Sequence, residues 1–348
     1  MKQIYFLVFL LTQVQLFAIE PKQKNELRIS FGSCLDQDME QDRIWKKIIS
    51  TQSDGFVFLG DNIYKDTYDM NEKKLEYSKL LSQKGYIELK KKTRIFATWD
   101  DHDYAVNDSG GEFSKKDESK KIFLETFNEP KDSKRWTRDG VYDSYELKLG
   151  KKIIRLILLD TRYNRSVLKK STFSFITRKG YIGNEDSDAT VLGEAQWNWL
   201  KEELLKPADL KVIVSSIQFH NENHGFEKWG NFPKEKIKFL NLLKETKSKS
   251  VVLITGDRHI GEFHKIEEKG LPKIYELTTS PMNRVLKFQA REEFHPDRLG
   301  AFTQEANFGL LRVFDTGNSI SVKLELHQLS GIVFSIESDS NELTEVIK

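Results

Sequence analysis

The feature that most constrains the fold is the stretch at residues 93–104, where an apolar run ends abruptly in ionisable residues. Residues 95–99 have the mostly apolar, β-favouring composition of a strand buried in a sheet. The sequence Asp-Asp-His-Asp follows directly at residues 100–103. Adjacent carboxylates repel each other and are costly to bury without a cation or a hydrogen-bond donor. A solvated acidic turn would also explain the pattern, but carboxylates and an imidazole at the end of a buried strand indicate a hard-metal site with a proton donor beside it.

Elsewhere the chain alternates between apolar, β-favouring runs and segments with helical spacing. The predicted strands cover residues 26–31, 55–59, 95–99, 152–159, 211–216, 251–254, 275–279, 309–314 and 320–326, and the predicted helices cover residues 43–50, 71–92, 192–205 and 233–245. This alternation is typical of α/β proteins with a largely parallel sheet. Ligand sites in such proteins form beyond the carboxyl ends of the strands, so we expect polar residues from several strand ends to meet at one rim.

The composition is that of a globular protein. With 348 residues, the chain is long enough for one large domain or two small ones. We find neither an internal repeat nor a linker that would divide it, and we expect a single folded domain over residues 26–335 with a frayed polar tail over residues 336–348. The net charge of +2, with basic residues spread along the sequence, carries no nucleic-acid-binding signature.

The N-terminus is predicted to be an export signal. Lys2 precedes an apolar run at residues 4–11, which is too short to span a bilayer, and Ala18 supplies a small residue for cleavage. A first core helix or an uncleaved anchor is the alternative interpretation. We therefore expect a signal peptide over residues 1–18 and a mature protein, without a transmembrane segment, that works in the periplasm or outside the cell.

Five of the predicted strands end in residues that bind metals or transfer protons. These residues are Cys34, Asp61, Tyr64, Asp100, Asp101, His102, His220, Asp257 and His259. A single histidine at a strand end is more often a structural group than a ligand, but five strand ends in one register are hard to obtain by chance. Carboxylates can bridge two cations, imidazoles suit transition metals, and a thiolate with a phenolate suits a ferric-type ion. The set indicates a multi-metal centre, in which Asp100 is a ligand or an orienting group.

Cys34 is the only cysteine in the sequence. An exported protein with one cysteine has no internal disulfide, so Cys34 is a buried apolar filler, a reactive thiol or a metal ligand. Two cations about 3.5–4 Å apart can clamp a phosphoryl group and activate a water or hydroxide for in-line attack. A nearby histidine can then protonate the leaving oxygen.

The motifs resemble those of the alkaline phosphatase D (PhoD-like) family of the metallophosphoesterase superfamily. The matching segments are Gly-Ser-Cys at 32–34, Gly-Asp-Asn-Ile-Tyr at 60–64, Trp-Asp-Asp-His at 99–102, Leu-Asp-Thr-Arg at 159–162, Leu-Gly-Glu-Ala-Gln-Trp at 192–197 and Thr-Gly-Asp-Arg-His at 255–259. The resemblance implies an α/β fold, a four-layer αββα sandwich with two facing mixed β-sheets between helices. It also implies hydrolysis of phosphate mono- or diesters and an iron and calcium centre, with other divalent metals as an alternative.

The resemblance further implies roles for individual residues. His102 matches the catalytic imidazole, and Asp61 matches a bridging carboxylate. The positions that match metal ligands are Cys34, Asp61, Tyr64, Asp101, His220, Asp257 and His259. Asn107 matches the family's downstream asparagine, which reaches a metal or the phosphate. Apart from the resemblance, Arg162, Arg258 and His224 are further candidates for substrate contacts, although either arginine could instead pin a carboxylate of the rim. The histidines outside the motifs are interpreted as structural or surface residues; they are His264, His295 and His327.

We therefore expect an exported, metal-dependent phosphoric ester hydrolase that acts as a monomer on a small-molecule or polymeric phosphate ester. Hydroxide held between metals at Asp61 and Asp101 is expected to attack phosphorus while His102 assists the leaving group. The rival enzyme is a phospholipase D- or teichoic-acid-type phosphodiesterase, in which residues 105–145 and 163–190 would select the substrate. The rival of another class is a non-catalytic metal-binding protein on the same fold.

Overall fold

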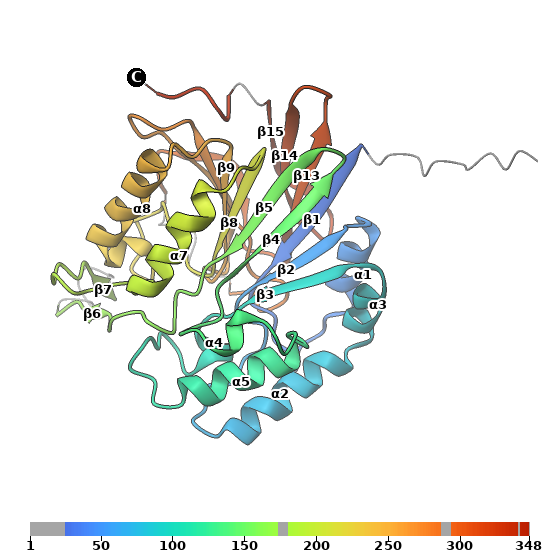
Figure 1. Ribbon diagram of the computed structural model, residues 1–348. Helices are drawn as coiled ribbons and strands as arrows, with labels where there is room; N and C mark the ends of the chain where they lie inside the picture. Colours follow the sequence, from blue (N-terminus) through green and yellow to red (C-terminus); the bar gives the residue numbers. More distant parts are fainter. Residues whose placement is uncertain (1–24, 173–179, 287–293, 340–341, 348) are drawn as a thin grey trace, which may run out of the picture.

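The computed structural model describes residues 25–172, 180–286, 294–339 and 342–347 (Figure 1). The predicted signal peptide at residues 1–18 lies outside the described residues. Within the described part of the chain, no helix combines the length and the apolar character needed to cross a membrane.

The first large sheet has six strands in the order β15-β14-β13-β1-β2-β3. Strands β1, β2 and β3 run parallel, and β13, β14 and β15 extend the sheet in antiparallel fashion from β1. The bounds are β1 Glu26–Gly32, β2 Gly55–Leu59, β3 Arg94–Thr98, β13 Asn307–Asp315, β14 Ile320–Gln328 and β15 Gly331–Asp339.

The second large sheet has seven strands in the order β12-β10-β11-β9-β8-β5-β4. Strands β5, β8, β9 and β11 run parallel, and antiparallel strands complete both edges. The bounds are β4 Asp143–Leu149, β5 Lys152–Leu158, β8 Leu210–Ser215, β9 Val251–Thr255, β10 Gly261–Ile266, β11 Ile274–Thr278 and β12 Arg298–Thr303. A separate ribbon pairs β6 (Lys169–Lys170) with β7 (Tyr181–Ile182).

Helices cover the outer face of each sheet (Figure 1). The helices on the side of the first sheet are α1 Asp42–Ser50, α2 Met70–Ser82, α3 Lys84–Lys92 and α5 Lys116–Thr126. The helices on the second sheet are α7 Glu194–Leu205 and α8 Pro233–Glu245. The short elements are α4 Asp101–Tyr104, η1 Lys134–Trp136 and η2 Trp229–Asn231.

Strand β2 shows how the sequence produces these layers. All five of its residues are buried, and successive side chains point to opposite faces of a strand. Val57 therefore belongs to the core between the two sheets, which it shares with residues of the second sheet such as Val252. Phe58 instead packs under the helices, with its ring 6.1 Å from that of Trp45 in α1. The predicted fold class, a four-layer αββα sandwich with two facing mixed sheets, is confirmed.

The predicted domain boundary at residue 335 and the frayed tail beyond it need correction. Strand β15 continues to Asp339, so the boundary would cut a strand. Farther on, Leu343 is fully buried in the core between the sheets. The carboxylate of Glu342 accepts a hydrogen bond of 2.7 Å from the hydroxyl of Tyr275 in β11. The same carboxylate lies 3.0 Å from Nζ of Lys273. The buried leucine and this ion pair hold the segment on the domain, although its composition is polar.

Candidate metal centre

Four carboxylates meet where strands of both sheets end. Asp61 follows β2, Asp100 and Asp101 follow β3, and Asp257 follows β9. Each offers one carboxylate oxygen, and these oxygens all lie within 4.8 Å of one another. Because the two sheets face each other, residues that are far apart in the sequence become neighbours at this rim. Buried carboxylates this close together require cations or strong donors for their charged form to be stable.

A thiol, a phenol and an imidazole surround Asp61. Its Oδ2 atom lies 3.4 Å from the Sγ atom of Cys34 and 2.9 Å from the hydroxyl of Tyr64. The Tyr64 hydroxyl also lies 3.2 Å from Nε2 of His259. The other ring nitrogen of His259, Nδ1, is 2.6 Å from the carbonyl oxygen of Arg284. That carbonyl accepts only from a protonated Nδ1, which leaves Nε2 of the neutral ring with a lone pair for a metal, the arrangement common for histidine ligands.

The backbone of the centre is strained. Cys34, Asp61, Asp257 and His259 have positive φ angles of 55°, 50°, 66° and 52°, respectively. Left-handed backbone costs a non-glycine residue roughly 1–2 kcal/mol, and such conformations persist mainly where the surrounding structure fixes them for function. Gly60 has a φ of 108°, and a Cβ atom placed on it would lie 2.5 Å from the Cβ of Asp100. The glycine therefore allows the two acidic turns to approach each other.

Asp103, the last residue of the acidic block, has a structural role. One of its carboxylate oxygens accepts hydrogen bonds from the backbone N–H of Asp100 at 2.7 Å and of Asp61 at 3.2 Å. The other oxygen accepts a bond of 2.5 Å from the side chain of Asn62. Asp103 is fully buried and ties the turn after β2 to the turn after β3. It thus fixes the separation of the carboxylates that form the centre.

Arg162 pins carboxylates rather than facing substrate. Its side chain is 0% exposed and donates to Asp100 at 2.5 Å, to Glu227 at 2.5 Å and to the carbonyl of Ser109 at 3.3 Å. Of the two roles considered from sequence, the structure supports the one in which the guanidinium holds the rim together. Arg162 is therefore corrected from a substrate contact to a buried counter-charge.

His102 lies at the edge of the centre. Its Nδ1 atom is 2.6 Å from the carboxylate of Asp66, and its ring centre is 4.4 Å from that of Tyr64. Burial opposes a charged ring, but the carboxylates of Asp101, Asp61 and Asp66 outweigh it and raise the pKa of His102 to about 10. In the absence of cations the imidazole is therefore protonated at neutral pH and can donate a proton.

The electrostatics of the centre favour bound cations. Burial and the charge of Asp101 raise the pKa of Asp61 well above its usual range, and burial with the charges of Asp100 and Asp101 does the same for Asp257. Burial, followed by the charges of Asp61 and Asp257, also raises the pKa of the Cys34 thiol. The Oδ2 atom of Asp100 is buried without a hydrogen-bond partner among the described residues. A cation would stabilise each of these groups in its ionised form, so the residues present fit a metal centre.

The structure does not bring His220 to this centre. Strand β8 ends earlier, and it is Ser216 that reaches the rim, where its hydroxyl donates to Asp100 at 2.6 Å. His220 lies four residues farther on, and its Nε2 atom is 2.9 Å from a carboxylate oxygen of Asp297. The sequence prediction therefore located the strand but placed its functional end too late. His224, a candidate for substrate contact, is 4% exposed, and its Nδ1 atom accepts a bond of 3.2 Å from the backbone of Phe226.

A cavity of about 700 Å³ opens beside the centre. Its lining residues include Tyr64, Asp101, His102, Asn107, Asp108, Lys170, Tyr181, Glu227, Asp257, Arg258, His259 and Arg284. Two of the predicted substrate contacts, Asn107 and Arg258, thus face this cavity. Arg258 lies with its guanidinium 4.4 Å from the ring centre of Phe226.

Sequence reasoning missed several residues of the site. Asp108 and Glu227 each place a carboxylate oxygen within 4.8 Å of Asp101 and of each other. Asp108 directly follows the predicted Asn107, whereas Glu227 lies in an irregular segment without a motif. Arg284 stacks over Tyr64, with its guanidinium 4.2 Å from the ring centre. No sequence pattern pointed to Arg284.

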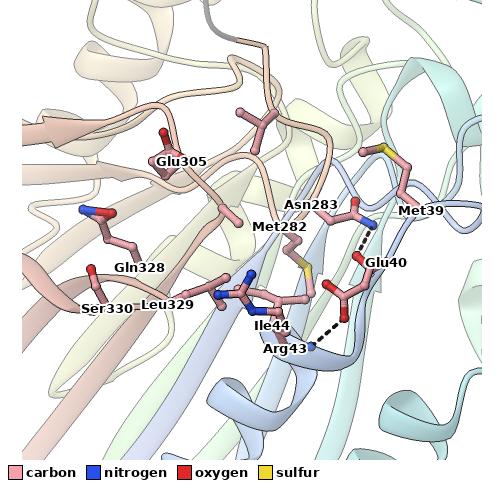
Figure 2. Close-up of a pocket in the computed structure, with 12 residues that line it drawn as sticks. Met39, Glu40, Arg43, Ile44, Met282, Asn283, Glu305, Gln328, Leu329 and Ser330 are labelled. Carbon is pink, nitrogen blue, oxygen red and sulfur yellow. Dashed lines mark hydrogen bonds between the residues drawn. The ribbon is translucent and has the colours of Figure 1, made fainter.

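Asn283 holds the segment that carries Arg284. Its side chain accepts a bond of 2.7 Å from the backbone N–H of Asp36 and donates to the carbonyls of Asp36 at 2.8 Å and Glu40 at 3.3 Å. Figure 2 shows the bond between Asn283 and Glu40 in the wall of a second hollow, which Met282 also lines. The loop after β1 and the loop after β11 are thereby joined behind the centre.

Comparisons with known proteins agree with this geometry. A family model described as PhoD-like phosphatase matches residues 29–319. A solved structure of PhoD superposes with a TM-score of 0.69 at 16% identity, and the match covers 94% of this chain and 74% of that chain. At that identity the likeness shows the fold. An uncharacterised Streptococcus pneumoniae protein, a predicted phosphoesterase, matches with a TM-score of only 0.30 at 8% identity over 90% of this chain and 98% of that chain, which is too low to support an inference. No curated protein matches the sequence.

Proposed function

Because the chain belongs to the PhoD-like phosphatase family, and is thus a phosphoric ester hydrolase, we propose that it hydrolyses phosphate mono- or diesters with a resident iron and calcium centre. The observation that carries the proposal is the convergence of Asp61, Asp100, Asp101 and Asp257 within 4.8 Å. Cys34 and Tyr64 at Asp61 add the soft and phenolic donors that suit ferric iron. Without these two donors, the cluster would fit calcium or magnesium alone.

The ligands divide naturally between two kinds of cation. Cys34, Tyr64, Asp257 and His259 would hold iron, since they supply sulfur, phenolate, carboxylate and imidazole donors. The oxygen-only group of Asp101, Asp108 and Glu227 suits calcium, and Asp61 lies between the two sets. When bound, the cations would stabilise charge on the phosphoryl oxygens and lower the pKa of a water molecule at the site.

The surrounding side chains would act on the ester itself. His102, oriented by the 2.6 Å contact between its Nδ1 atom and Asp66, would hold a proton on Nε2 and transfer it to the leaving oxygen. Arg258 and Arg284 line the cavity and would contact the non-bridging oxygens of the phosphate. Asn107 lies on the same wall and would donate a hydrogen bond to the ester.

The cavity also bears on the substrate. Its volume of about 700 Å³ exceeds what a phosphate group alone needs, and part of its wall is the β6–β7 ribbon, through Lys170 and Tyr181. We infer that the ribbon contacts the organic part of the substrate and that a diester with a bulky leaving group is accommodated. The apolar run and the small residue at the N-terminus support export of the enzyme, which would then act on periplasmic or extracellular phosphate esters.

The proposal is tested by measuring metal content and activity together. Purified protein is analysed for iron and calcium and assayed with p-nitrophenyl phosphate and bis(p-nitrophenyl) phosphate. We expect Cys34→Ala to lose iron and most of its turnover, whereas His102→Ala should lose turnover and keep its metals. Ser53→Ala, at a buried residue bonded to Ser30 at 2.8 Å, controls for loss of a small buried side chain. Iron-free protein with full activity would refute the iron centre, and an active His102→Ala would refute the acid.

A further inference from the structure

A second group of metal-binding side chains lies away from the centre. Its members come from three separate segments: His220 after β8, His264 within β10, and His295 with Asp297 just before β12. Among the described residues these side chains share no cluster with the carboxylates at the strand ends. We call them the histidine cluster. The proposed hydrolysis assigns it no role.

The distances within the histidine cluster suit a shared ion. His220, His295 and Asp297 each offer a ligand atom, and these atoms lie within 4.8 Å of one another. One oxygen of Asp297 is 2.9 Å from Nε2 of His220 and 3.8 Å from Nδ1 of His295. That Nδ1 also accepts a bond of 3.2 Å from the backbone N–H of Asp297, so in the neutral ring Nε2 carries the proton and Nδ1 is the nitrogen with the lone pair.

His264 supplies an independent indication of a ligand. Its side chain is 0% exposed, and neither ring nitrogen has a hydrogen-bond partner among the described residues. The nearest acidic atom, in Glu262, is 4.0 Å from Nε2. Burying an imidazole without partners costs roughly 1–3 kcal/mol per polar group left unpaired, and a coordinated ion would satisfy one of these nitrogens.

The three rings are also spaced as ligands of one ion. Their centres are 4.8 Å apart for His220 and His295, 5.5 Å for His264 and His295, and 5.8 Å for His220 and His264. Three imidazoles around a tetrahedral ion, with metal–nitrogen bonds of about 2.0–2.1 Å, have ring centres about 5 Å apart. Small side-chain rotations would therefore bring all three nitrogens to bonding distance.

We propose that the histidine cluster binds one transition-metal ion of the Zn²⁺ type, with three imidazoles and the carboxylate of Asp297 as ligands. Imidazole with one carboxylate is a donor set that suits zinc rather than calcium. The surroundings supply orienting groups: Glu276 accepts bonds of 2.8 Å from the backbone N–H groups of Phe219 and His220. No ligand position is left open, so the site is structural.

An ion in the histidine cluster would connect one wall of the active-site cavity to the second sheet. His220 begins the segment that continues through Phe226 and Glu227, which line the active-site cavity. Asp297 is held on β10 by a hydrogen bond of 3.0 Å from the backbone of Lys265 to its carbonyl. An ion shared by His220 and Asp297 would fasten this cavity wall to the second sheet. The inference does not depend on the reaction catalysed at the other centre.

The test counts metal in untagged protein whose main centre is disabled by Cys34→Ala and Asp61→Asn. This background is titrated with Zn²⁺ by calorimetry and with Co²⁺ by visible absorption, which reports tetrahedral coordination. We expect one tight equivalent of Zn²⁺ and the intense absorption of tetrahedral cobalt. Adding His295→Ala or Asp297→Asn should weaken binding roughly 100-fold or more, since even changes to groups behind the ligands cost about 10–100-fold. His264→Gln should lose the tetrahedral signal.

His327→Ala is the matched control, because this histidine bonds Glu325 at 2.8 Å outside the cluster; it should bind as the background does. If His264→Gln fails to fold, His295→Ala and Asp297→Asn decide the question, because their side chains are 15% and 47% exposed. A background that binds no Zn²⁺ at micromolar concentration would overturn the proposal. So would unchanged binding after His295→Ala.

Discussion

Replacing Arg162 by methionine should destabilise the protein strongly. The side chain is 0% exposed and donates at 2.5 Å both to Asp100 and to Glu227. Methionine has a similar length and fills most of the same volume, so the substitution removes the charge and the hydrogen bonds with little change in packing. Asp100 thereby loses its cation, whereas Glu227 keeps a second one, because Nε of the buried Arg165 lies 2.8 Å from its Oε1 atom.

The size of the effect follows from the loss of that cation. Breaking a buried ion pair by removing one partner costs about 3–5 kcal/mol, because the other charge is left uncompensated. Asp100 can reduce this cost by taking up a proton, since burial already raises its pKa to about 7 against the opposing charge of Arg162. We therefore expect a loss of about 4 kcal/mol in the free energy of unfolding at pH 8. The loss should be smaller at pH 6, where Asp100 is largely protonated in either protein.

The assay is urea unfolding followed by tryptophan fluorescence, with a chelator present so that metal release does not contribute. Arg28→Met is the matched control: its pair with Glu26 is 30% and 19% exposed, and such pairs contribute at most about 1 kcal/mol. A loss below about 1 kcal/mol for Arg162→Met would refute the assignment as a buried counter-charge. Unchanged stability with a raised KM would restore a role in substrate binding.

Two further predictions concern the turns that carry the carboxylates. Gly60→Ala would place an alanine at a positive φ angle, with its Cβ atom 2.5 Å from the Cβ of Asp100. We expect the free energy of unfolding to fall by about 3 kcal/mol or more and bound metal to be lost. Gly317→Ala is the control: its φ is 89°, but no atom lies within 4 Å of the added Cβ, so it should lose only the backbone-conformation cost of about 1–2 kcal/mol. Equal losses of stability in the two variants would show that the clash at Gly60 does not contribute. For His102→Gln in chelator, the wild type should be the more stable by a margin that is full below pH 6.5 and declines as pH rises through about 10, because the folded pKa of His102 is raised. If urea titrations showed the stability difference between wild type and variant growing as pH rises, the prediction would be wrong.

Much of the fold was predictable because apolar runs report buried strands and helices directly. Strand β2 and helix α8 match the predicted residues 55–59 and 233–245. The predicted helix at 71–92 divides into α2 and α3, because Gln83 adopts an extended conformation. Strand β10 was missed, since Glu262 and His264 interrupt its apolar pattern although both are fully buried. Polar residues inside a sheet conceal a strand from any argument based on hydrophobicity.

The site residues at strand ends were also predictable from the sequence, whereas those in irregular segments were not. Cys34, Asp61, Asp101 and Asp257 each lie within three residues of a strand end, so the topology of the sheets alone brings them together. Glu227 comes from an irregular segment, and its position depends on tertiary contacts that leave no periodic trace in the sequence. The same limitation affected His220, because the end of its strand does not reveal the path of the chain beyond it.

The arrangement of the centre explains why the loops that carry its carboxylates are tied together by buried hydrogen bonds. Several candidate ligands adopt left-handed backbone, as Cys34 and Asp61 do, and ionised neighbouring carboxylates repel one another where no cation lies between them. Both effects favour opening of the loops, so elements that need no metal must hold them. Asp103 does so by accepting the backbone N–H groups of both acidic turns, and Arg162 does so by neutralising Asp100. Because these two residues hold the loops of the candidate centre without belonging to its carboxylate cluster, the proposed site would keep its shape without metal, and metal binding would not also have to supply the free energy to order it.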